Sequence, residues 1–159
     1  MPNTGQKSTG LIAFDGSAES RAAVVTAAGV LGVDEVFVLT AWEPLHNSHG
    51  SHGTRTAHGD LDEQQDPAYQ EASATCADGV QLCTEHGLSA KPLLVKCATA
   101  VWTAIVDSAE EVNADVIITG TRALRGWKSL VQTSVSDSIV KNAGRPVLIV
   151  PPVGEETAT

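Results

Sequence analysis

The segment from Val116 to Ser136 carries the residue types best suited to binding a phosphate group. A short apolar run ends at Gly120, a basic loop with Arg122 and Arg125 follows, and threonine and serine open the next predicted helix. The unpaired N–H groups and partial positive charge of a helix N-terminus attract anions. This order of strand, basic loop and helix start therefore predicts an anion-binding turn in an α/β protein.

The charge distribution agrees with a small anionic ligand at this loop. The chain of 159 residues has a net charge of −9, which argues against a nucleic-acid partner. Residues 1–119 contain five basic and sixteen acidic side chains, whereas residues 120–150 contain five basic side chains and one acidic one. A solvated basic loop that balances the acidic remainder is an equally open interpretation.

The hydrophobic pattern predicts five strands that alternate with four helices. The strands are expected at residues 10–15, 34–42, 90–97, 115–119 and 146–150. The helices are expected at residues 17–31, 67–86 and 99–113, and from Thr133 or Ser134 to about residue 143. Alternation of this kind predicts a doubly wound, Rossmann-like α/β fold with a parallel sheet in the order 3-2-1-4-5. Its ligand crevice would lie between the carboxyl ends of strands one and four, so that Asp15 and Gly120 face each other.

Residues with strong positional preferences mark the predicted helix ends. Ser17 and Thr99 are expected to cap the first and third helices, and Asp66 is expected to cap the second, with proline in its first position. Gly32 and Gly87 are expected to end the first and second helices. Asp15-Gly16-Ser17 is also a common turn, so Asp15 has a local interpretation beside a ligand-binding one.

Three motifs together resemble the universal stress protein family. They are Asp15-Gly16-Ser17-Ala18-Glu19-Ser20, the loop from Gly120 to Ser136 that leads into Val135-Ser136-Asp137-Ser138-Ile139-Val140, and the ending Arg145-Pro146-Val147-Leu148-Ile149-Val150-Pro151. The resemblance covers roughly residues 9–151. It implies the α/β fold of the adenine nucleotide alpha hydrolase-like proteins, a homodimer formed through residues 146–150, and adenine-nucleotide binding in a stress response.

The resemblance also implies roles for particular residues. Asp15 is similar to the residue that contacts the adenine and ribose end, and Ala41 to the residue whose backbone contacts the base. Gly120 matches the first glycine of the family's Gly-x2-Gly-x9-Gly-Ser/Thr loop, and Ser134 matches its final Ser/Thr. The residues that we expect to line the nucleotide site are Ala13, Phe14, Asp15, Ala41, Thr119, Gly120, Arg122, Ala123, Gly126, Thr133, Ser134, Val135 and Ser136.

Two residues depart from the family's loop. Ala123 and Thr133 stand where the second and third glycines are expected, and a β-branched threonine disfavours positive φ and adds bulk near a phosphate. AMP or cyclic AMP would need less room than ATP at this loop. If ATP is the ligand, we expect Mg²⁺ to bind with it. Three functions stay open: nucleotide-linked signalling, a dimeric interaction module without nucleotide, and a weak ATPase.

Four of the five histidines, His46, His49, His52 and His58, fall within thirteen residues. Imidazole clusters bind Zn²⁺ or related ions when their geometry is fixed, and Asp60 and Asp62 could add ligands. Residues 43–66 are, however, rich in glycine and serine, which is typical of a mobile loop. We expect no built metal site, with weak adventitious metal binding as the alternative.

No catalytic constellation accompanies these motifs. The spacing around Gly126 and Lys128 does not match a P-loop, and no nucleophile elbow or suggestive carboxylate pair is present. We therefore expect a binding protein rather than an enzyme. The three cysteines, Cys76, Cys83 and Cys97, are expected to be buried thiols, as is usual in the cytoplasm.

The rest of the sequence predicts one domain. It is expected at residues 9–152, between polar tails at residues 1–8 and 153–159, with no membrane segment. Trp102 lies on an apolar helix face and is expected in the core. Trp127 fits a loop, a partner contact or a packing position equally well.

Overall fold

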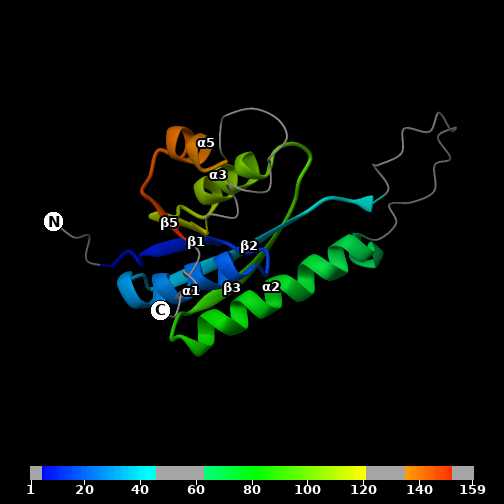
Figure 1. Cartoon of the computed structure of the whole chain (residues 1–159). Helices are drawn as coiled ribbons and strands as arrows, with labels where there is room; N and C mark the ends of the chain where they lie inside the picture. The colour runs from blue at the N-terminus through cyan, green and yellow to red at the C-terminus, as the bar shows by residue number, and fades with distance from the viewer. Residues whose placement is uncertain (1–4, 46–62, 121–134, 152–159) are drawn as a thin grey trace, which may run out of the picture.

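The computed structural model describes residues 5–45, 63–120 and 135–151, which form a sheet with helices on both faces (Figure 1). The strands are β1 (Thr9–Ala13), β2 (Glu35–Trp42), β3 (Ala90–Lys96), β4 (Val116–Gly120) and β5 (Val147–Val150). The helices are α1 (Ala18–Val30), α2 (Pro67–Glu85), α3 (Val101–Glu111) and α5 (Val135–Asn142), with the 3-10 turn η2 (Glu63–Gln65) before α2. The predicted alternation is confirmed, and η2 corrects the last residues of the segment predicted as loop.

Neighbouring strands are parallel throughout, and their order is β3-β2-β1-β4-β5. Helices α1 and α2 cover one face of this sheet, and α3 and α5 cover the other (Figure 1). The chain therefore changes faces after β3, and the strand order reverses between β1 and β4. This is the predicted doubly wound, Rossmann-like arrangement.

Apolar side chains on both faces of the central strands hold the layers together. The layer under α1 and α2 contains Ile12, Val36, Val38 and Ile118, and the layer under α3 and α5 contains Leu11, Leu39, Ile117 and Ile105. These side chains are almost completely removed from solvent. Each such burial stabilises the fold by about 1.5–3 kcal/mol, so β1, β2 and β4 form a rigid platform for whatever lies at their carboxyl ends.

Several predicted helix boundaries are confirmed by their hydrogen bonds. Ser17 Oγ accepts a hydrogen bond from the Ser20 N–H at 3.2 Å, which caps α1. Asp66 Oδ1 accepts one from the Ala68 N–H at 2.9 Å, with proline in the first position of α2. Gly87 follows α2 with φ +83°, a conformation that glycine adopts without steric cost.

One predicted cap is wrong, and one helix ends earlier than expected. The chain is still extended at Ala100, so this residue and not Thr99 is the N-cap of α3, without a side-chain cap bond. Helix α1 stops at Val30, because Leu31 already has the extended angles φ −105° and ψ 134°. The expected terminator, Gly32, lies one residue further on.

Strands β3 and β5 form the two edges of the sheet. At the ends of β3, the Ser89 carbonyl accepts from the Val36 N–H, and the Cys97 N–H donates to the Trp42 carbonyl, both at 2.8 Å. The backbone N–H and C=O groups of odd-numbered β3 residues therefore point toward β2, and those of even-numbered residues point away from the sheet. Pro92 occupies an outward position, so its missing N–H removes no bond from the ladder.

The remaining expectations about the core are also met. All three cysteines are buried and free of disulfides. Trp102 is half-buried and packs against the apolar layer under α3 and α5.

Among the helices of the described residues, none has the length and hydrophobicity needed to cross a membrane.

Candidate functional site

The carboxyl ends of β1 and β4 lie next to each other where the strand order reverses. Ile12 pairs with Ile118 in the parallel register, and the chains continue from there to Ala13 and Asp15 on one side and to Gly120 on the other. The predicted site residues of both strands thus approach the same edge of the sheet. This is the position at which doubly wound sheets bind ligands.

The predicted residues at this edge divide between the two faces of the sheet. Ala13 and Ala41 pack toward the α3 and α5 layer, whereas Phe14 packs into the layer under α1 and α2. The Phe14 N–H donates to the Leu39 carbonyl at 2.8 Å, and its carbonyl accepts from Thr40 Oγ1 at 2.9 Å. Phe14 therefore anchors the end of β1, and both alanines face the opposite side of the sheet.

The exposed Asp15 carboxylate lies at the turn between β1 and α1. Its Oδ1 accepts a hydrogen bond from the Ser17 N–H at 2.9 Å, and Gly16 completes the turn with φ +79°. This bond confirms the turn interpretation of the motif. It also holds the carboxylate beside the N-terminus of α1, next to the carboxyl ends of β1 and β4.

Gly120 has a steric role in the fold. A Cβ at this position would lie 2.7 Å from the carbonyl carbon and oxygen of Glu19, in the first turn of α1. The preceding Thr119 is buried, and its hydroxyl donates to the Gly120 carbonyl at 3.1 Å. Because only glycine lets β4 approach α1 this closely, the packing explains this residue independently of any ligand.

The remaining predicted site residues belong to the segment after β4 and to the start of α5. Arg122, Ala123, Gly126, Thr133 and Ser134 lie outside the described residues. Val135 and Ser136 are the first described residues of α5 and lie within the helix predicted to begin at Thr133 or Ser134, two residues that themselves lie outside the described ones.

Arg145 corrects the picture of a basic cluster around the loop. Its guanidinium Nη1 donates to the carbonyls of Ala109 and Ala114 at 2.6 and 2.7 Å, and its Nε donates to Ala143 at 3.1 Å. The Ala109 carbonyl belongs to the last turn of α3, whereas the carbonyls of Ala114 and Ala143 follow α3 and α5. All three lie at the amino end of β5, opposite the carboxyl ends of β1 and β4. Arg145 is thus a structural cation, and its charge does not belong to the loop predicted to bind an anion.

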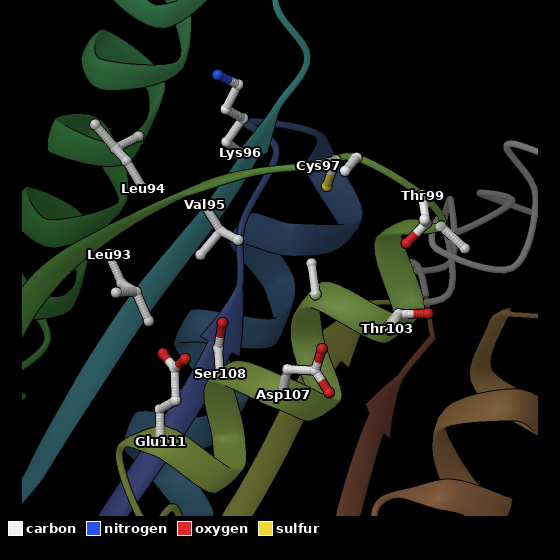
Figure 2. Close-up of a pocket in the computed structure, with 13 residues that line it drawn as sticks. Leu93, Leu94, Val95, Lys96, Cys97, Thr99, Thr103, Asp107, Ser108 and Glu111 are labelled. Atoms are coloured by element: carbon white, nitrogen blue, oxygen red, sulfur yellow. The ribbon is translucent and has the colours of Figure 1, made fainter. Parts of the chain in front are cut away.

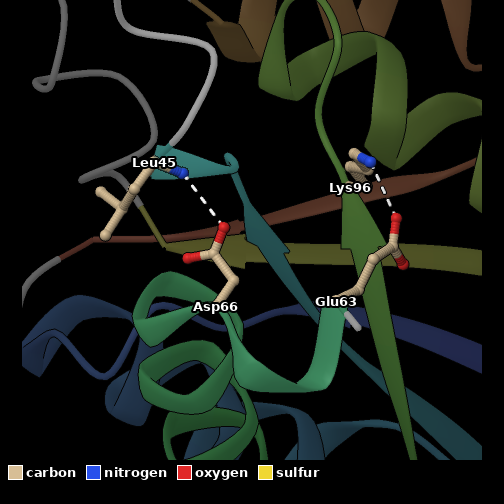
Figure 3. A network of polar contacts seen from close by, with 4 residues as sticks. All are labelled: Leu45, Glu63, Asp66 and Lys96. Carbon is tan, nitrogen blue, oxygen red and sulfur yellow. Dashed lines mark hydrogen bonds and ion pairs between the residues drawn. The ribbon is translucent and has the colours of Figure 1, made fainter. Parts of the chain in front are cut away.

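Two polar contacts that sequence reasoning missed lie beside β2 and β3 (Figure 3). Asp66 Oδ2 accepts from the Leu45 N–H at 3.2 Å, and Lys96 Nζ pairs with Glu63 at 2.7 Å. The first contact joins residues on either side of segment 46–62, which lies outside the described residues, and the second joins Glu63, directly after that segment, to the end of β3. A carboxylate at a helix cap is a recognisable sequence signal, but its second partner is set by the tertiary fold.

The histidines predicted to lie in a loop, with the accompanying acidic residues Asp60 and Asp62, fall within that same segment and outside the described residues. Within residues 5–45, 63–120 and 135–151, no group of three or more histidine, cysteine or acidic side chains is arranged to hold a metal ion.

A groove of about 420 Å³ runs between β3 and α3 (Figure 2). Cys97 lines its end, where burial, with a smaller contribution from the Glu43 carboxylate, raises the pKa of the thiol. This thiol is therefore poorly suited to act as a nucleophile near neutral pH. The four-residue spacing of Thr103, Asp107 and Glu111 is the sequence signal that could have revealed the groove's polar wall.

Solved structures share this fold. The universal stress protein of Archaeoglobus fulgidus, solved with dAMP, is 22% identical with TM-score 0.64, and the match covers 91% of this chain and 98% of the other. A universal stress protein in complex with cAMP is 20% identical with TM-score 0.65, covering 92% and 98%. A family protein from Arabidopsis thaliana with AMP bound is 14% identical with TM-score 0.61, covering 96% and 97%.

No curated protein matches the sequence. The model of the universal stress protein family, in contrast, matches residues 10–151, which together with the three motifs and the strand order shows that the chain belongs to this family.

Proposed function

We propose that the protein is a cytoplasmic stress-response protein that binds an adenine nucleotide at the carboxyl ends of β1 and β4. The observation that carries this proposal is the parallel pairing of β1 with β4 at the reversal of strand order, with the Asp15 turn at its mouth. Relatives of the same fold were solved with dAMP, cAMP and AMP. Ala13 and Ala41, both half-buried, place small side chains at this edge on one face of the sheet.

The nucleotide that fits the sequence best carries a single phosphate. Ala123 and Thr133 replace two glycines of the family's loop, and each adds volume where phosphate oxygens would approach the backbone. AMP and cyclic AMP place fewer charged oxygens there than ATP does. We therefore propose AMP or cyclic AMP as the ligand, bound by Asp15 at the ribose end and by the start of α5 at the phosphate end.

Calorimetric titration of the nucleotide-stripped protein with AMP, cyclic AMP and ATP with Mg²⁺ tests this proposal. We expect saturable binding of AMP or cyclic AMP, weakened at least tenfold in Asp15→Ala because a charge-assisted hydrogen bond is lost. Asp78→Ala removes the same charge from an exposed position of α2 and should leave the affinity unchanged.

Absence of heat from all three nucleotides, with a folded protein, would reject nucleotide binding. Preferred binding of ATP followed by phosphate release would instead favour the weak ATPase. Equal losses of affinity in Asp15→Ala and Asp78→Ala would show that net charge, and not the turn, governs the interaction.

A homodimer through β5 is part of the same proposal. Strand β5 is an edge of the sheet, and Ile149 is half-buried without belonging to either apolar layer. Pairing with a second copy would cover this side chain and the strand edge. Sedimentation should give twice the chain mass of 16.5 kDa, and Ile149→Lys should shift the protein to monomer, whereas Val140→Lys on the exposed face of α5 should not.

A further inference from the structure

The groove between β3 and α3, hereafter the β3–α3 groove, has two unlike walls (Figure 2). On the sheet side, Leu93 and Val95 are half-buried and belong to the apolar layer under α3. On the helix side, Thr103, Asp107 and Glu111 recur at every fourth position. Residues with this spacing share one helix face, so an apolar floor runs beside a polar wall.

The two walls are matched in length. Strand β3 rises about 13 Å from Leu93 to Cys97 at about 3.3 Å per residue. Helix α3 rises about 12 Å from Thr103 to Glu111 at 1.5 Å per residue. The groove is therefore long enough for about four residues of an extended chain.

Ser108 contributes a polar group that lacks a partner. Its side chain is only 3% exposed, and it extends from α3 toward β3 into the groove (Figure 2). In the part of the chain that the structure describes, its hydroxyl makes no hydrogen bond. A buried hydroxyl in this state is unfavourable unless something binds to it. The groove thus contains a buried hydroxyl that a hydrogen-bonding ligand would satisfy.

The charged side chains on the α3 wall of the groove determine which sign of charge the ligand should carry. Asp107 and Glu111 are exposed carboxylates on the groove, and neither forms an ion pair within the described residues. The nearby cation, Lys96, is already paired with Glu63 at 2.7 Å. With a net chain charge of −9, this wall favours a ligand that carries positive charge.

The sheet side of the groove also exposes backbone. Leu94 packs its side chain into the layer under α1 and α2, so it lines the groove through its main chain. Leu94 and Lys96 are even-numbered positions, whose N–H and C=O groups face away from β2. No strand of residues 5–45, 63–120 or 135–151 pairs with this edge of β3. An edge of this kind is the usual docking place for an extended peptide.

We propose that the β3–α3 groove binds an extended segment of a partner protein that alternates apolar residues with lysine or arginine. The apolar side chains lie on Leu93 and Val95, a backbone group of the segment bonds to Ser108, and the cations pair with Asp107 and Glu111. The edge of β3 supplies main-chain hydrogen bonds along the segment. This surface is separate from the β1–β4 edge and does not depend on nucleotide binding.

Titration of the ¹⁵N-labelled full chain with a blocked six-residue peptide that alternates valine and lysine tests the proposal. We expect saturable shifts of amide resonances in β3 and α3, and none with the matching peptide of valine and glutamate. The double variant Asp107→Asn, Glu111→Gln should bind at least fivefold more weakly. Glu110→Gln neutralises an exposed carboxylate of α3 that does not line the groove, and should retain the affinity within twofold.

Further measurements distinguish peptide binding from the binding of other ligands and from effects of the substitutions on folding. Ser108→Ala should weaken binding several-fold while its circular dichroism spectrum and unfolding midpoint show a folded protein. Asp15→Ala should bind the peptide as the natural chain does. Equal binding of both peptides, equal effects of Glu110→Gln and the double variant, or the same shifts with spermidine alone would overturn the proposal.

Discussion

Gly120, the last residue of β4, lies against the main chain of Glu19 in the first turn of α1, where a methyl group would come within 2.7 Å of the carbonyl. This contact joins the end of one central strand to the helix that follows the other. It fixes the spacing of the β1–β4 edge and places α1 over β4. The glycine that resembles a nucleotide-loop residue is thus required by packing alone.

Gly120→Ala should destabilise the fold by about 1–3 kcal/mol, because backbone atoms, unlike a flexible side chain, cannot move aside easily. Urea unfolding measures this change. The matched control is Gly29→Ala in α1, where a Cβ would meet nothing within 4 Å. That variant should gain about 0.5–1 kcal/mol from helix propensity. Equal stability of the two variants would show that β4 and α1 are not in contact.

Much of the fold could be predicted because local signals and long-range packing agree. Apolar strands alternating with helices were sufficient to predict a parallel sheet, although alternation alone does not determine the strand order. The caps at Ser17 and Asp66 depend only on neighbouring residues. The cap predicted at Thr99 failed because the chain stays extended for one further residue, to pack Val101 against the sheet. A local preference could not reveal that tertiary requirement.

Fewer contacts of the site could be predicted, because many of them join residues that are far apart in the sequence. The Asp15 turn involves residues two apart, and its hydrogen bond follows from the motif. Arg145, in contrast, lies 36 residues from Ala109 in sequence and meets its carbonyl only in the folded sheet. The β3–α3 groove exists because α3 leaves part of β3 uncovered, a feature of helix placement that no single motif encodes.

Substitution of Arg145 should be more destabilising than that of other surface cations, because its guanidinium donates to one carbonyl in the last turn of α3 and to two that follow α3 and α5. Arg145→Met should cost about 2–3 kcal/mol, since hydrogen bonds from a charged donor contribute more than neutral ones. Arg145→Lys should recover only part of this loss, because an ammonium cannot reproduce the planar fork. Guanidinium unfolding measures both.

The control for charge alone is Lys91→Met, which breaks the exposed ion pair with Glu35. Its effect should stay below about 1 kcal/mol. Similar losses in Arg145→Met and Lys91→Met would contradict the structural role of Arg145.

Asp66 links α2 to the segment after β2 through one carboxylate, since Oδ1 caps α2 and Oδ2 accepts from the Leu45 N–H. Asp66→Ala should therefore cost about 1–2 kcal/mol, a cap of average strength or somewhat more. Asp66→Asn keeps a cap acceptor and should lose less. Lys96→Met removes the neighbouring exposed ion pair with Glu63 and should change the unfolding free energy by less than about 1 kcal/mol. Equal losses in Asp66→Ala and Lys96→Met would refute the dual role.

Cys83 should make the stability of the fold depend on alkaline pH. Its burial in α2 raises the pKa of the thiol from 9.0 to about 11. Between these values the unfolded chain releases a proton that the folded chain retains, so the unfolding free energy falls as pH rises, by at most about 3 kcal/mol in all. Below pH 9 this contribution is fully present. Cys83→Ala should be less stable at pH 8 because of the cavity, yet lose less stability than the natural chain between pH 9 and 11 in urea unfolding. Parallel pH profiles for the two proteins would show that this thiol titrates alike in both states.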